Sequence, residues 1–162
     1  PLVSHWVQKM EMTLDNVSFS RVDADTLDKL IQKEEEIPSK LSEKEQEELK
    51  PIFEETVDKQ KFQIKFENMS EQDAPIVITQ PEFIRRMQEQ QATGGAGFIG
   101  AFPETYNMIV NNNHPKVYSI LQAKGEDRAQ KAKQLTDLAL LAQGLLKGEA
   151  LTNYINRSIE LI

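Results

Sequence analysis

Alternating apolar and polar residues predict three short strands in the middle of the chain. Phe62, Ile64 and Phe66 alternate with charged or amide side chains, which is the period of a strand with one buried face. Residues 76–78 form a short apolar run, and residues 106–110 form a third segment in which Ile109 faces the opposite side from its neighbours. Gly, Pro, Asn and Asp residues separate these runs, as expected between strands.

Helical periodicity dominates the rest of the chain. The spacing of apolar residues predicts helices over 2–12, from 82 onward, and over 115–123, 126–146 and 149–161. Ser42 and Glu45 form a capping-box pattern in a charged stretch, and Pro115 after His114 marks a helix start. We therefore expect an α+β fold: a small, mainly antiparallel sheet of about three strands, with helices on one side and a C-terminal helix pair.

The last two predicted helices are apolar on more than one side. One side of such a helix can lie on the sheet, but the other needs a partner, and no further helix remains in the chain. Two copies of the pair would cover each other as a two-fold four-helix bundle, whereas the alternative is a core helix buried within a monomer. The predicted dimer interface comprises Leu135, Leu138, Leu141, Ala142, Leu145, Leu151, Tyr154, Ile155, Ile159 and Ile162.

Composition excludes several classes of function. The 162 residues carry a net charge of −7, which argues against a nucleic-acid-binding module. The chain has no cysteine, which excludes disulfide scaffolds, thiolate zinc sites and cysteine nucleophiles. It has only two histidines, which excludes a poly-imidazole metal site. No apolar run approaches the ~20 residues of a membrane span, so we expect no membrane partner and a cytoplasmic location. The chain begins with Pro1, which suggests a piece of a larger protein.

A glycine-rich stretch is the only motif with a link to cofactors. Gly95, Gly97 and Gly100 match G-x-G-x-x-G, which binds dinucleotides when it follows a strand and opens a helix. Here an Arg- and Gln-rich helix precedes the motif and Phe102-Pro103 follows it, which favours a loop. A small nucleotide-binding enzyme that uses this Gly95–Gly100 loop and a monomeric scaffold domain are the alternative functions. We predict no catalytic, cofactor-binding or metal-binding residue.

Several segments together resemble the C-terminal part of the ninety-kilodalton heat-shock chaperone family, in its bacterial, high-temperature protein G branch. They are Ala74–Thr79, Glu82-Phe83 with Met87, Tyr106–Pro115, Leu138–Gly144 and Asn153–Arg157. The resemblance covers about residues 59–162. It implies three regions: the end of a middle domain (1–22), a charged helical connector (23–58) and a C-terminal dimerisation domain (59–162).

The resemblance also implies a function. Members of the family are ATP-dependent, homodimeric chaperones of stressed cells, and their ATP and Mg²⁺ bind in an N-terminal domain that these residues do not match. The segment would then be no enzyme itself, with no cofactor of its own. It would form the homodimer and contact unfolded or partly folded client proteins. The client-contact residues implied are Trp6, Phe83, Ile84 and Met87.

Overall fold

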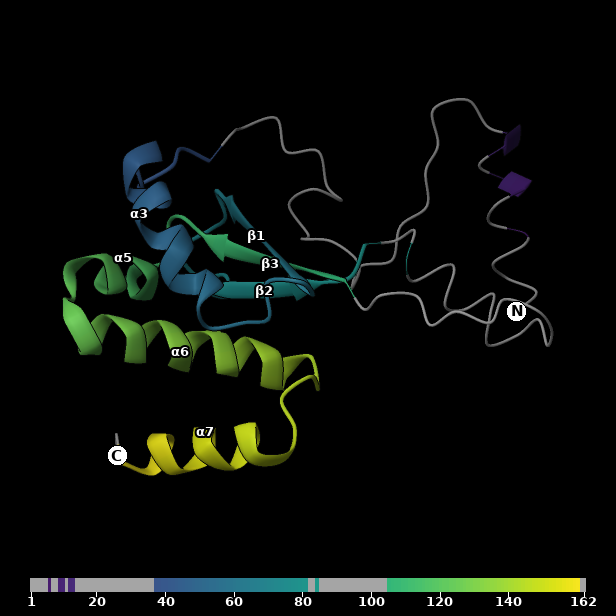
Figure 1. Ribbon diagram of the computed structural model, residues 1–162. Coiled ribbons are helices and arrows are strands. Elements are labelled where there is room, and N and C mark those ends of the chain that lie inside the picture. Colours follow the sequence, from purple (N-terminus) through teal and green to yellow (C-terminus); the bar gives the residue numbers. More distant parts are fainter. Residues whose placement is uncertain are drawn as a thin grey trace.

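A computed structural model describes most of the chain after residue 36 (Figure 1). The described residues are Trp6, Lys9, Met10, Met12, Thr13, 37–81, Ile84 and 105–160. In chain order, their elements are α3 (Glu43–Glu54), β1 (Phe62–Glu67), β2 (Ile76–Thr79), β3 (Tyr106–Asn111), α5 (Pro115–Gln122), α6 (Gly125–Ala142) and α7 (Gly148–Glu160). All three predicted strands and the α+β class are thereby confirmed. The helix predicted over 2–12 is described only at Trp6, Lys9, Met10, Met12 and Thr13, and the helix predicted from 82 onward only at Ile84; these residues are helical.

The three strands form a mixed sheet in the order β1-β3-β2. β1 pairs with β3 in parallel, with Phe62 opposite Tyr106 and Glu67 opposite Asn111. β2 pairs with β3 antiparallel. The expectation of a mainly antiparallel sheet was therefore wrong. Because β3 lies between two strands of opposite direction, it pairs in parallel with one and antiparallel with the other.

Helices α3, α5 and α6 and one face of the sheet enclose a single core. Ile64, Ile78 and Met108 project from the strands into the same cluster as Val117 and Ile120 of α5. Ala132 and Ala139 of α6 join this cluster from the neighbouring helix. Their small side chains let α6 lie close to the sheet, as Figure 1 shows. The prediction of helices on one side of the sheet is confirmed for this part of the chain.

Helix α3 is part of this core. Leu49 and Phe53 are completely buried, and the ring of Phe53 meets that of Phe66 edge-on at 6.5 Å between centroids. The second half of the stretch interpreted as a charged connector (23–58) thus packs on the sheet, while its charges stay on the outer side. The division into three regions, with boundaries after residues 22 and 58, stays a prediction.

Local capping explains where α3 and α5 begin. The Ser42 amide and hydroxyl donate to Glu45 Oε2 at 2.8 and 2.7 Å, and Ser42 Oγ accepts from the Glu45 amide, so the predicted capping box is confirmed. These hydrogen bonds from Ser42 lower the pKa of Glu45 below its usual value. His114 caps α5, because its Nδ1 accepts from the Lys116 amide at 3.1 Å.

Helix α6 ends earlier than predicted. The periodicity suggested 126–146, but the helix stops at Ala142. Gly144 adopts a left-handed conformation (φ +68°), and the amides of Gly144 and Leu145 donate to the carbonyls of Leu141 and Leu140. This pair of bonds is a Schellman motif, which satisfies the last carbonyls of the helix. Glycine meets the positive φ without strain, so the chain turns there although leucines follow.

Three consecutive asparagines anchor the end of β3. Asn111, Asn112 and Asn113 are all buried. The side-chain amide of Asn111 donates to the Ser70 carbonyl at 2.8 Å, and that of Asn113 donates to the Met69 carbonyl at 2.9 Å. The asparagines therefore hold the turn between β1 and β2 against the start of α5. Their role in this part of the fold is structural.

Candidate association surface on the last two helices

The last two helices form an antiparallel hairpin at one edge of the domain. Gln134 pairs with Ser158, and Asp137 pairs with Arg157, so residue numbers rise in one helix as they fall in the other. In Figure 1, α7 lies beside α6, on the side away from the sheet. The structure describes every residue from 148 to 160, and none of these residues is buried. Helix α7 is thus an outer layer that covers α6 and remains uncovered itself.

Each helix of this hairpin exposes a pair of large apolar side chains. Leu138 and Leu141 of α6 are 45% and 39% exposed, and Ile155 and Ile159 of α7 are 47% and 64% exposed. The members of each pair are three or four residues apart, and side chains at this spacing share one helix face. Complete burial of such a side chain contributes about 1.5–3 kcal/mol relative to full exposure, so covering the fraction that each of the four still exposes would add part of this stabilisation. Such a surface suits association with another chain.

The other predicted interface residues differ in exposure, and one of them is not described. Leu135, Leu145, Leu151 and Tyr154 are partly buried, whereas Ala142 is exposed and Ile162 lies outside the described residues. Leu135 and Leu145 pack against the core of their own domain. The exposed members of the predicted interface are therefore the ones free to meet a second chain. The interface itself stays a prediction.

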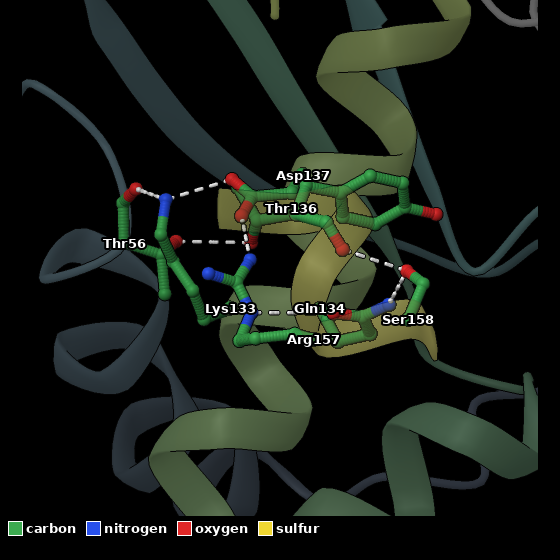
Figure 2. A network of polar contacts seen from close by, with 8 residues as sticks. Thr56, Lys133, Gln134, Thr136, Asp137, Arg157 and Ser158 are labelled. Atoms are coloured by element: carbon green, nitrogen blue, oxygen red, sulfur yellow. Dashed lines mark hydrogen bonds and ion pairs between the residues drawn. The ribbon is translucent and has the colours of Figure 1, made fainter. Parts of the chain in front are cut away.

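A buried carboxylate lies where α6 meets α7 (Figure 2). Asp137 is 1% exposed, and its Oδ1 accepts from Lys133 Nζ at 2.7 Å, one turn earlier in α6. Its Oδ2 accepts from the Arg157 guanidinium of α7. Gln134 Nε2 adds a hydrogen bond to Ser158 Oγ at 2.8 Å, and Arg157 Nε also contacts Gln134 Oε1. A carboxylate removed from water needs such partners, because an unpaired buried charge is costly.

The same network reaches α3 on the other side of α6. The hydroxyls of Thr56 and Thr136 lie 2.9 Å apart, and Thr136 is completely buried. Lys133 Nζ also lies 3.5 Å from the Thr56 carbonyl. Figure 2 shows these side chains in one connected group, with Thr56 on one flank and Ser158 on the other. Polar contacts therefore join the turn after α3, helix α6 and helix α7.

The sequence analysis missed this network. Its signal is a single acid, Asp137, in the run Leu135–Ala142, where Thr136 is the only other polar residue. A charge at such a position requires a partner, and Lys133 four residues earlier is one candidate from sequence alone. Arg157 could not be assigned, because its contact depends on how the two helices dock.

The residues implied in client contact are described only in part. Trp6 is helical and 63% exposed, and Met10 and Met12 nearby are exposed as well. Ile84 is helical and half-buried, while Phe83 and Met87 lie outside the described residues. Exposed methionine and aromatic side chains adapt to varied apolar partners. Client contact stays a prediction for all four residues.

The described residues contain no cofactor-binding or metal-binding site among the other candidates. The Gly95–Gly100 loop lies outside the described residues. Within residues 37–81 and 105–160, no three His, Asp or Glu side chains gather in a way that could hold a metal ion. Nor is any helix in these ranges long and apolar enough to cross a membrane.

Comparison with known proteins identifies the relatives of the chain. No protein-family model matches it. It is 30% identical to the chaperone protein HtpG of Porphyromonas gingivalis W83 over 98% of its length, and it covers 33% of that protein. It is 28% identical to HtpG of Bacteroides fragilis and of Bacteroides thetaiotaomicron over 96% of its length, again covering 33% of each. Thus the chain is a homologue of the HtpG chaperones and spans about one third of the length of these relatives.

Proposed function

We propose that this chain is the C-terminal association domain of an HtpG-type chaperone. Helices α6 and α7 would pair with the same helices of a second copy and form a four-helix bundle. The observation that carries this proposal is the exposure of Leu138, Leu141, Ile155 and Ile159 on a helix hairpin whose outer member has no buried residue. Self-association around a two-fold axis would cover the same surface on both copies.

Association would act by tethering. Joining two chains at this domain raises the effective concentration of whatever else each chain carries, so contacts between those parts become nearly intramolecular. In a chaperone of this type, the parts brought together would be the remaining two thirds of the relatives' length. Binding and hydrolysis of ATP, with Mg²⁺, would belong to those parts rather than to residues 37–160.

The first experiment measures molar mass by light scattering after size exclusion, over a dilution series. We expect twice the chain mass of 18.5 kDa, falling towards the monomer on dilution. Leu138→Lys and Leu141→Asp should give soluble monomers, because a buried unpaired charge costs about 3–5 kcal/mol. Tyr118→Asp is the matched control: Tyr118 is also about 44% exposed but lies on α5, so this variant should remain dimeric.

Either of two results would contradict the proposal. A wild-type monomer at every concentration would mean that the exposed side chains serve no self-association. Dimers of unchanged affinity in both leucine variants would place the interface elsewhere on the molecule.

A second surface would contact client proteins. We propose that Trp6 and the helix around it offer weak, adaptable contacts to unfolded segments, since Trp6, Met10 and Met12 are exposed. Trp6 is the only tryptophan, so its emission reports directly on this surface. Adding an unfolded variant of a small tryptophan-free protein should shift the emission to the blue, whereas adding the folded parent of that variant should not. Equal spectra with both forms would remove Trp6 from the proposed surface.

A further inference from the structure

Helix α7 is held to the domain differently from the other helices. Helices α3, α5 and α6 each contribute fully buried side chains to the core, whereas α7 contributes none. Its packing partner in Figure 1 is α6. The contacts that fix its position include the ion pair between Arg157 and Asp137 and the hydrogen bond between Gln134 and Ser158. Docking of α7 therefore relies on these polar pairs together with the partly buried Leu151 and Tyr154, without any fully buried apolar side chain.

The connection between α6 and α7 is built so that α7 could rotate as a rigid helix. The connection from α6 is anchored by Leu146, which is 5% exposed. After this anchor only Lys147 precedes Gly148, whose φ is +59° and whose surroundings are open. Undocking α7 would thus require rotation about the backbone next to Gly148 and would leave the core cluster intact.

Asp137 binds residues of both helices of the hairpin. It lies in α6 but is paired with α7 through Arg157, and its other oxygen is held by Lys133, which also contacts the Thr56 carbonyl after α3. If α7 leaves, Asp137 loses Arg157 but keeps Lys133. Its charge is then still partly compensated, so the domain can tolerate the undocked state.

We propose that Asp137 and Arg157 form a latch that positions α7 for self-association. With the latch closed, α7 is fixed against α6, and the surface proposed to meet the second copy combines Ile155 and Ile159 with Leu138 and Leu141. With the latch open, α7 moves about Gly148 and that surface is lost, although neither residue of the latch is among the exposed apolar residues of the interface. This inference rests on the proposed self-association.

The latch is tested first by hydrogen exchange, in the Leu138→Lys background so that a second copy does not protect α7. Asp137→Asn and Arg157→Gln should each speed exchange in residues 148–160 by about tenfold or more, since each breaks a charged hydrogen bond. Exchange in β1 and β3 should not change. The matched control is Asp127→Asn, because Asp127 and Lys131 form an exposed pair with the same four-residue spacing and the same 2.7 Å distance as Lys133 and Asp137.

Unchanged exchange in α7, or equal acceleration in α7 and in the sheet, would overturn the latch. Arg157→Gln keeps this test available if Asp137→Asn fails to fold, because Arg157 is about one third exposed. The double variant should exchange no faster than the faster single variant, since both remove the same contact.

The effect on association is measured separately, with Leu138 intact. We expect the dimer dissociation constant of Arg157→Gln to rise about tenfold or more, and that of Asp127→Asn to stay at the wild-type value. A wild-type dimer with an unchanged constant in Arg157→Gln would overturn the positioning role while the proposed function stands. A wild-type monomer would refute the proposed function, and the role in association would fall with it.

Discussion

Replacing Phe53 by alanine tests whether α3 belongs to the folded domain or is a connector that lies against it. The side chain is completely buried, and its ring contacts Phe66 edge-on. Truncating a buried Phe costs about 3–5 kcal/mol, which includes the cavity left behind. Against a total stability of about 5–15 kcal/mol, this would remove a large part of the free energy of unfolding.

Urea unfolding followed by circular dichroism at fixed protein concentration is the suitable assay. Trp6 is exposed and lies far along the chain from α3, so its fluorescence is a poor probe of this core. We expect the urea midpoint of Phe53→Ala to fall markedly, and its melting temperature to drop by roughly 6–20 °C at 2–4 °C per kcal/mol. Lys50→Ala is the control, because Lys50 is exposed on the same helix and its loss should change stability by less than about 0.5 kcal/mol.

A loss below about 1 kcal/mol in Phe53→Ala would refute the reasoning, because truncating a buried Phe costs about 3–5 kcal/mol whereas surface substitutions usually stay within about 0.5 kcal/mol. Helix α3 would then be an appendage, and the domain would begin near residue 59 as the resemblance implied. A large loss would move the start of the folded unit to at least the beginning of α3.

Three further predictions concern the ends of helices. Ser42→Ala should destabilise the protein by about 1 kcal/mol in urea unfolding, whereas Glu45→Gln, which can keep the capping box, should cost less; equal losses would contradict the cap. Burial and the charge of Lys116 lower the pKa of His114 below 6.5, so the folded state binds this proton more weakly than the unfolded state. The stability that neutral His114 contributes is therefore complete above about pH 6.5, the pKa in the unfolded state, and is lost as the pH falls from there to the lower pKa of the folded state. His114→Asn should accordingly reduce the change in melting temperature between pH 7 and pH 5. Gly144→Ala should cost about 1–2 kcal/mol through its positive φ alone, since an added Cβ meets nothing within 4 Å, and Gly144→Asn should cost less.

Local patterns in the sequence determined the elements of this protein and their ends. Strict alternation identified β1, and the capping residues Ser42 and His114 marked the starts of α3 and α5. These signals depend on residues within one or two turns of each other. Even the early end of α6 has a local cause at Gly144, although the leucines beyond it concealed the stop.

Pairings between distant segments were decided only by the tertiary structure. Residues 62–67 pair in parallel with residues 106–111, and no short-range pattern specifies which strand becomes the central one. The burial of Phe53 depends on Phe66, and the role of Asp137 depends on Arg157, twenty residues further along the chain. Such contacts form when whole elements dock, so the sequence could predict the apolar surplus of α6 and α7 but not the buried carboxylate that joins them.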